Sequence, residues 1–191
     1  MRPTVRAVCG VLAIAAVVAC ESTAPRLVPV TLHLTDAPGV ASLSSPTDGE
    51  PLTVTGATVR ISRAYLTPGE SEDGPGLTIT NEAQEYDLLA LKDGATALLG
   101  NALIPEGQYS QLRLVVESAD VTLSDGTTHA LFVPSGEESG IKVTFPGTIT
   151  VGGSATGITV DFDPTANFQI APHNDNRVIF TPLLVGTVTE G

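Results

Sequence analysis

The sequence predicts an all-β protein: an antiparallel β-sandwich, immunoglobulin-like or transthyretin-like, with about ten short strands and little or no helix. Apolar and polar residues alternate in many short runs, the pattern of strands with one buried face. Turn-forming residues separate these runs, with 19 Gly and 14 Pro among 191 residues. No stretch shows the apolar period of an amphipathic helix. Short strands with frequent turns are typical of sandwiches and barrels.

The first predicted strand spans residues 27–35, where Val30, Leu32 and Leu34 alternate with polar residues. It ends at the Asp-Ala-Pro-Gly turn of residues 36–39. In this turn Asp can bond the backbone ahead, Pro fixes φ and Gly permits a positive φ. A loop rich in Ser, Pro, Gly and Asp comes next.

The middle of the chain predicts further strands separated by turns. The stretch 88–99 is rich in Leu and Ala, but Asp93-Gly94 in its middle is a hairpin signal, so we predict strand, turn and short strand. An acidic loop is expected at 67–76. The predicted strands of this region are 52–66, 77–80, 84–89 and 110–118, the last with Leu112, Leu114 and Val116 on one face.

The last third of the chain repeats this pattern. Ser124-Asp125-Gly126 is a strong hairpin signal between two short apolar runs. The last two segments, 168–170 and 177–188, are expected to pair with each other. The strands predicted before them are 120–123, 127–133, 140–145, 148–151 and 158–162.

The N-terminus has the order of a secretory signal. Two arginines precede an apolar run over residues 7–19, and the composition turns polar from Glu21. As a helix, 13 apolar residues span about 20 Å, which is too short for a bilayer core of about 30 Å. A transmembrane anchor is therefore disfavoured, whereas a plain signal peptide stays open as one interpretation of this stretch.

Cys20 directly follows Val-Val-Ala, so the stretch resembles a bacterial lipobox. The resemblance implies cleavage before Cys20, a diacylglycerol on its sulfur and an acyl chain on its new amine. We therefore expect a signal peptide at 1–19, the lipidated Cys20 with its tether at 20–26, and a β-sandwich domain at 27–191. The tether reaches about 20 Å. Cys9 leaves with the signal peptide, so no disulfide forms within the domain.

The mature chain is strongly acidic. All 21 acidic and seven of the nine basic residues lie in residues 20–191, which gives a net charge of −14. Such a surface repels phosphate backbones, so nucleic acid is not expected as a partner. For the same reason we expect the body to stand off an anionic membrane surface. With no Trp, an aromatic platform for sugar stacking is poorly supplied.

Four segments together resemble a family of bacterial lipoprotein domains known as the domain of unknown function number 4382. These segments are residues 30–38, 86–89, 103–109 and 160–163, and the resemblance runs from about residue 30 to about residue 184. It implies an extracytoplasmic β-sandwich lipoprotein and carries no activity. Pro105, Gly107 and Tyr109 also resemble a turn of transthyretin-like and carboxypeptidase-regulatory-type modules, which are mostly accessory or adhesive.

Asp161 and Asp163 are the sharpest candidates for a metal site. Period-2 geometry places both carboxylates on one face of a strand and Phe162 in the core. Together with Asp36 they could supply oxygen ligands for Ca²⁺. The alternative is that these carboxylates bond turn amides or lie in solvent.

No sequence motif for catalysis is present. His33, His129 and His173 lack metal-ligand spacing, and Gly152-Gly153-Ser154 lies between strands rather than at a nucleophile elbow. We therefore expect a protein that is not an enzyme. A hydrolase site assembled from distant strands is the minor alternative.

The sequence therefore predicts a monomeric, exported, lipid-anchored structural or binding module of the cell envelope. The membrane is the outer one if the cell has two, and the domain is periplasmic or surface-facing. Its partners are an envelope protein or a glycan, met by loops such as 40–51 and 67–76. A Ca²⁺-binding adhesive or glycan-binding module is the alternative.

Overall fold

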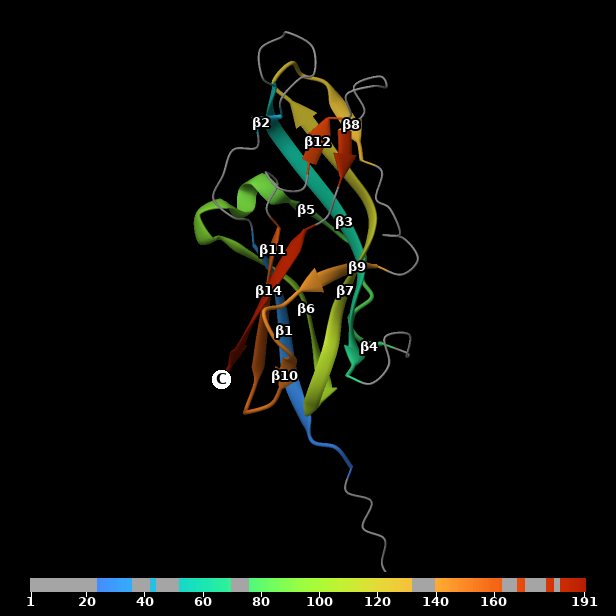
Figure 1. Ribbon diagram of the computed structural model, residues 1–191, viewed down its shortest axis with the longest axis vertical. Coiled ribbons are helices and arrows are strands. Elements are labelled where there is room, and N and C mark those ends of the chain that lie inside the picture. Colours follow the sequence, from blue (N-terminus) through green and yellow to red (C-terminus); the bar gives the residue numbers. More distant parts are fainter. Residues whose placement is uncertain are drawn as a thin grey trace, which may run out of the picture.

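Two strands of 17 residues each dominate the computed structural model (Figure 1). They are β3 (Leu52–Pro68) and β7 (Gly107–Leu123), which pair antiparallel from Val54 with Leu123 to Pro68 with Tyr109. At about 3.3 Å per residue, each would be roughly 55 Å long. Their register shifts at four places, so the ribbon bends and twists along its length. This ribbon makes the molecule elongated.

The structure describes residues 24–35, 42–43, 52–69, 76–131, 140–162, 168–170, 178–180 and 183–191. These residues form fourteen strands, one 3₁₀-helix and no α-helix. Besides β3 and β7, the elements are β1 (Leu27–Thr35), β2 (Ser42–Leu43), β4 (Leu77–Thr80), β5 (Gln84–Asp87), η1 (Leu88–Gly94), β6 (Thr96–Pro105), β8 (Thr128–Ala130), β9 (Ile141–Thr144), β10 (Ile149–Val151), β11 (Thr156–Phe162), β12 (Phe168–Ile170), β13 (Val178–Phe180) and β14 (Leu184–Glu190).

Twelve of the strands form one sheet, whose main path is β2-β3-β7-β9-β14-β11-β1-β6. Strands β4 and β5 pair with β3, and β8 and β10 pair with β7, while β12 and β13 form a separate two-stranded sheet. The large sheet curls until β4 lies against β6, the last strand of the path, so it is a mixed and nearly closed barrel. We call the line between β4 and β6 the seam.

The core fills the inside of this sheet. On β1 the odd-numbered residues face outward or are half-buried, whereas Val28, Val30, Leu32 and Leu34 are buried. The largest fully buried side chains are Phe162, Leu32, Leu34, Ile61, Leu66, Leu88, Leu112, Leu114, Ile149, Ile158 and Leu184.

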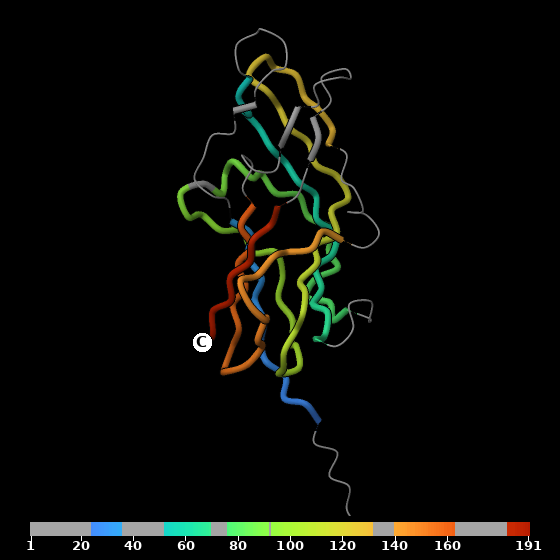
Figure 2. The backbone as a smooth tube through the Cα atoms, in the orientation of Figure 1, coloured from blue at the N-terminus to red at the C-terminus, as the bar shows by residue number. Residues whose placement is uncertain are grey.

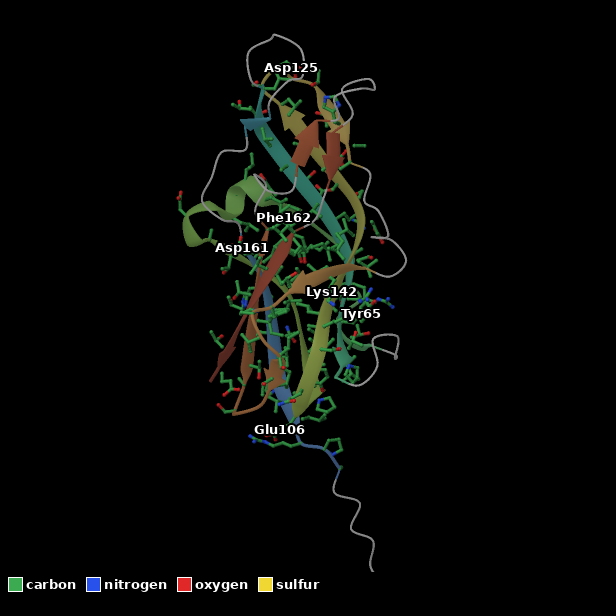
Figure 3. The ribbon with its side chains drawn as sticks, viewed as in Figure 1. Tyr65, Glu106, Asp125, Lys142, Asp161 and Phe162 are labelled. Atoms are coloured by element: carbon green, nitrogen blue, oxygen red, sulfur yellow. The ribbon has the colours of Figure 1, made fainter. Side chains whose placement is uncertain are left out.

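The molecule has two distinct ends. At the entry end, around Leu27 and Glu106, the chain enters β1, and β6 leads into β7 (Figure 2). The far end carries the hairpin between β7 and β8. Glu106 and Asp125 mark these opposite ends in Figure 3. The long ribbon of β3 and β7 therefore separates the far end from the point where the N-terminal segment leaves.

The all-β prediction is confirmed. The first strand spans residues 27–35 as predicted. The hairpin at Ser124-Asp125-Gly126 joins β7 to β8, and Gly126 has a φ of 84°. Leu112, Leu114 and Val116 are all buried, as the alternation of their strand indicated.

The antiparallel prediction is wrong at two strand pairs. Strands β1 and β11 run parallel, as do β9 and β14. Alternation assigns each residue to a face, but it carries no information on the direction of a strand's neighbour. The separate short strands also merge into a curled, mixed sheet rather than a clear antiparallel sandwich.

Three of the predicted segments differ in kind from the structure. The segments 110–118 and 120–123 are parts of one strand, β7, because Ala119 stays buried in its ladder. The segment 88–94 is the 3₁₀-helix η1 rather than a strand and a hairpin turn, and Asp93 and Gly94 at its end have φ values of 59° and 83°. The final segment is divided between β13, which pairs with β12, and β14, which joins the large sheet.

Within the part of the chain that the structure describes, no helix has the length and apolar character needed to cross a bilayer. The loops at 40–51 and 67–76, predicted as ligand-binding surfaces, lie largely outside the described residues.

Candidate functional site

A pocket of about 370 Å³ lies at the seam. Its size falls in the usual range of small-ligand sites. Ile79 and Leu99 are buried and form its floor. The other residues that line it are Thr80, Asn81, Glu82, Gln84, Leu98, Gly100 and Asn101. The pocket therefore has a small apolar floor and a largely exposed rim that is mostly polar, with Leu98 as its apolar member.

The pocket exists because the two seam strands are not bonded to each other. Strand β4 ends at Thr80, and the chain returns to the ladder of β3 only at Gln84. A Cβ built on Gly100 of β6 would lie only 2.7 Å from the Cβ of Thr80. The strands thus approach closely at Gly100, and the pocket opens beside this contact.

Gln84 is held in place by a buried tyrosine. The Tyr86 hydroxyl lies 3.1 Å from Gln84 Oε1, to which it donates, and 3.4 Å from the carbonyl oxygen of Leu98 on β6. Burial raises the pKa of Tyr86, so the hydroxyl remains a protonated donor at neutral pH. With Oε1 accepting this bond, the Gln84 amide nitrogen provides the donors of that side chain.

The lining chemistry favours an uncharged polar ligand. Asn81, Gln84 and Asn101 carry carboxamides, each with both donors and an acceptor. Thr80 Oγ1 accepts a bond from the backbone N–H of Glu82 at 3.3 Å, which fixes the turn between β4 and β5. Among the described residues that line the pocket, Glu82 is the one ionisable group, and none is a Lys or Arg that could neutralise an anionic ligand.

The predicted Ca²⁺ ligands are placed only in part. Asp161 lies half-buried on β11, beside Thr35 of β1 and Val185 of β14. Phe162 is buried, as predicted. Asp36 and Asp163 lie outside the described residues, so the Ca²⁺ hypothesis stays a prediction. Among the residues that are described, no group of three or more His, Cys, Asp or Glu side chains is placed to hold a metal ion.

Two other predicted positions also lie outside the described residues. They are Cys20, expected to carry the lipid, and His173. The lipid anchor therefore stays a prediction.

The hairpin at the far end brings three chemistry-bearing side chains together. Thr127 Oγ1 lies 2.6 Å from Asp125 Oδ1 and 3.0 Å from His129 Nε2. The Thr127 hydroxyl and backbone N–H hold the pKa of Asp125 below its ordinary value, and the nearby His129 lowers it further. Since the Thr127 proton is given to Asp125, the His129 nitrogen donates to Thr127 and does not act as its base.

This order differs from that of a hydrolase triad, in which the histidine stands between the acid and the hydroxyl. The hairpin is also exposed on all sides at Asp125, Gly126 and Thr127. His33 lies on β1 opposite Leu98 of β6 and beside Thr159 of β11, away from this cluster.

Sequence reasoning missed the pocket entirely. Asn81 and Glu82 fall between the predicted strands 77–80 and 84–89, and Asn101 has no motif around it. The residues come from two segments about 20 positions apart, and only the curling of the sheet brings β4 against β6. The amides Asn81, Gln84 and Asn101 stand close in sequence to the apolar Ile79 or Leu99. This combination is the one signal in the sequence that could have indicated the pocket residues.

Comparison with curated proteins and with solved structures finds no match. One family model, described as Domain of unknown function (DUF4382), matches residues 28–182, which is most of the chain. Strands β2 to β13, and β1 except its first residue, lie within the matched range, which includes the seam and its pocket. The chain therefore belongs to the DUF4382 family of domains of unknown function.

Proposed function

We propose that this protein is a lipid-anchored binding module of the cell envelope, and that its seam pocket holds an uncharged glycan. The signal sequence and Cys20 support export and anchoring. The elongated ribbon of β3 and β7 supports the proposal as well, because it extends the domain away from the tether. The observation that carries the binding role is the pocket itself, with three carboxamides around a small apolar floor.

Carboxamides suit sugar hydroxyls because each side chain can donate and accept at once. An anionic ligand is disfavoured, since the mature chain carries a net charge of −14 and the described residues of the pocket include no cationic side chain. The pocket also lacks an aromatic ring, so a single sugar would bind weakly. The proposed role is therefore retention at a membrane surface, where many anchored copies act together.

Binding rather than cleavage is proposed because glycoside hydrolysis uses a pair of carboxyl groups. Glu82 is the one carboxylate among the described residues that line the pocket. It can accept hydrogen bonds from a sugar, but it has no second acid across the pocket to complete the pair.

The test is saturation-transfer NMR on the acylated protein, kept in a zwitterionic detergent that contains no sugar. Neutral oligosaccharides are compared with charged ones and with short peptides. Asn101→Ala and Gln84→Ala should each abolish the signal of a bound glycan. Gln108→Ala is the matched control, because Gln108 is an exposed amide on β7 that does not line the pocket.

Tyr86→Phe should weaken the same signal, since it frees the Gln84 amide to rotate. A glycan that binds equally well to Asn101→Ala and to the unchanged protein would place the site elsewhere. Binding of peptides but not of glycans would replace the proposed ligand class with a protein partner.

A further inference from the structure

Four apolar side chains lie together on the outer face of the sheet at the entry end. Leu27 and Pro29 of β1 stand opposite Pro105 and Leu103 of β6 in the antiparallel register. Leu27 is 53% exposed and Leu103 is 62% exposed. Opposite residues in such a pair have their side chains on the same face. We call these four residues the apolar collar.

The collar is distinct from the core and ends abruptly. Between its residues, Val28 and Ile104 point the other way and are buried. The next outward pair along the two strands is Thr31 with Asn101, which is polar. The outer face of an antiparallel pair is normally polar, so an apolar patch there indicates a contact surface.

The collar lies where the chain enters the barrel. The carbonyl oxygen of Arg26 accepts a 2.8 Å hydrogen bond from the backbone N–H of Glu106, which fixes this point to the end of β6. Six residues separate Cys20 from Leu27. At about 3.5 Å per residue they reach no farther than roughly 25 Å. A lipidated Cys20 therefore keeps the collar close to the bilayer that holds it.

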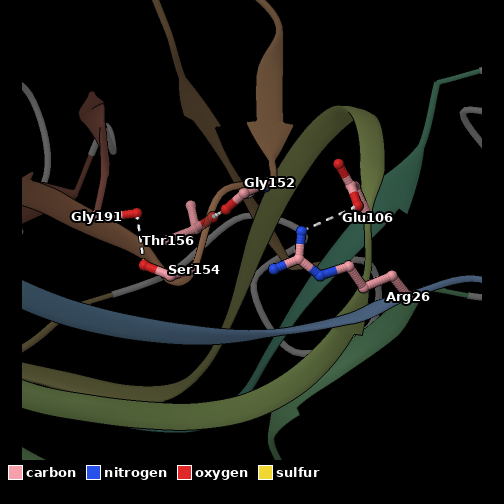
Figure 4. A network of polar contacts seen from close by, with 6 residues as sticks. All are labelled: Arg26, Glu106, Gly152, Ser154, Thr156 and Gly191. Carbon is pink, nitrogen blue, oxygen red and sulfur yellow. Dashed lines mark hydrogen bonds and ion pairs between the residues drawn. The ribbon is translucent and has the colours of Figure 1, made fainter.

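Charge at this end differs from that of the whole chain. Arg26 Nη1 lies 3.8 Å from Glu106 Oε2, so the acid adjoining the collar is balanced by a cation (Figure 4). Arg26 and Glu106 together carry no net charge, so this acid adds little to the repulsion between an anionic surface and the collar. Pro29 and Pro105 offer no backbone N–H, which disfavours strand addition by a second copy. These features favour a lipid surface as the occupant.

We infer that the apolar collar is a membrane-contact surface, seated in the interfacial region of the bilayer into which Cys20 is acylated. The inference rests on the proposed lipid anchor. In this arrangement the collar touches the bilayer while the rest of the acidic body points away from it. The contact orients the long axis, so that the seam pocket and the far end keep a fixed direction relative to the membrane.

The chain contains no tryptophan, so a single introduced one is an unambiguous reporter. The experiment compares Leu103→Trp and Leu27→Trp with Leu98→Trp, all as full acylated protein in zwitterionic vesicles with brominated acyl chains. Leu98 is a matched control, since it is 49% exposed on the same strand as Leu103. Five residues place it about 17 Å farther along.

We expect the brominated lipid to quench the indole fluorescence of Leu103→Trp and Leu27→Trp by about twofold or more and to leave that of Leu98→Trp unchanged. Acylated protein in which none of the three variants is quenched would overturn the collar contact and leave the anchor intact. Equal quenching of Leu98→Trp would also overturn the collar contact, because it would mean that the barrel lies flat on the membrane.

Two further outcomes separate the collar from its alternatives. Protection of the Leu103→Trp indole that depends on protein concentration without lipid would overturn the lipid contact and assign the collar to a second copy. Absence of acyl chains on Cys20, measured by mass spectrometry, would overturn the anchor and the inference together.

Discussion

The hydroxyl of Tyr109 donates a 2.7 Å hydrogen bond to the carbonyl oxygen of Pro105, four residues earlier in the chain. Tyr109 is buried, and Pro105 is the last residue of β6. The bond therefore closes the tight connection between β6 and β7 at the entry end. Together with the bond from Glu106 to Arg26, it fixes β1, β6 and β7 to one another where the chain enters.

Replacing Tyr109 with Phe should lower the free energy of unfolding by about 1 kcal/mol, since the Pro105 carbonyl loses a buried partner. The ring itself keeps its packing, so a larger loss is not expected. Urea denaturation of the two proteins measures the difference. An unchanged midpoint would show that water replaces the tyrosine hydroxyl at this carbonyl.

Alkaline pH should destabilise the fold through its buried tyrosines. Burial raises the pKa of both Tyr86 and Tyr109 above the ordinary value of 10.0. Near and above that pH the unfolded chain releases these protons while the folded chain keeps them. The unfolded state then binds fewer protons, so stability is full below about pH 10 and falls as the pH rises through the folded pKa values.

Denaturation midpoints followed from about pH 8 to about pH 11 measure this loss. The double variant Tyr86→Phe, Tyr109→Phe should be less stable at neutral pH but should show a shallower decline above about pH 10. Equal slopes for the two proteins would assign the alkaline loss to other groups.

The turn between β10 and β11 depends on one buried hydroxyl. Thr156 Oγ1 accepts from the backbone N–H of Gly152 at 3.2 Å and donates to the carbonyl oxygen of the same residue at 3.2 Å (Figure 4). Thr156 and Gly152 are both buried. Thr156→Val should therefore cost about 1–3 kcal/mol of unfolding free energy, because two backbone groups lose their partner away from water.

Ser154→Ala is the matched control for this change. Ser154 donates a 2.8 Å bond to the carbonyl oxygen of Gly191, but both residues are exposed, so water can replace the hydroxyl. We expect a change within about 0.5 kcal/mol. If the two variants prove equally stable by urea denaturation, the Thr156 hydroxyl is not a structural bond of this turn.

Much of the fold could be predicted from sequence because the alternation of apolar and polar residues in each strand indicates which side chains are buried. The alternation over residues 27–35 correctly assigned Val30, Leu32 and Leu34 to the core. The Asp-Gly pair at 125–126 correctly marked a hairpin, whereas the pair at 93–94 ends a 3₁₀-helix, and both glycines have a positive φ. Strand neighbours were beyond reach, because the parallel pairing of β1 with β11 joins segments more than 120 residues apart.

The candidate site could not be predicted either, because it also depends on which strands become neighbours. Turn residues 81–84 and strand residues 98–101 carry no motif by themselves. Their meeting follows from the curvature of a sheet that begins with β2 and ends with β6, and sheet curvature depends on the register shifts between β3 and β7. One of those shifts lies beside Gly56, where a glycine inside a strand pattern predicts a bulge, whereas the other three left no mark in the apolar pattern.

The seam provides the sharpest test of this curvature. Gly100 has no side chain, and a Cβ at this position would lie 2.7 Å from the Cβ of Thr80 and 3.1 Å from its Cγ2. Gly100→Ala should therefore push β4 away from β6, cost about 1–3 kcal/mol of unfolding free energy, and weaken glycan binding in the adjacent pocket. Urea denaturation and saturation-transfer NMR measure the two effects.

Gly157→Ala on β11 is the control, because its Cβ would meet the hydroxyl oxygen of exposed Thr189, which can rotate away. Its cost should stay within about 0.5 kcal/mol. In a protein that also carries Thr80→Gly, Gly100→Ala should lower the free energy of unfolding much less. The Thr80 Cβ that the new methyl group would contact is then absent. If Gly100→Ala is as harmless as Gly157→Ala, then β4 and β6 are not held in contact and the barrel is open at the seam.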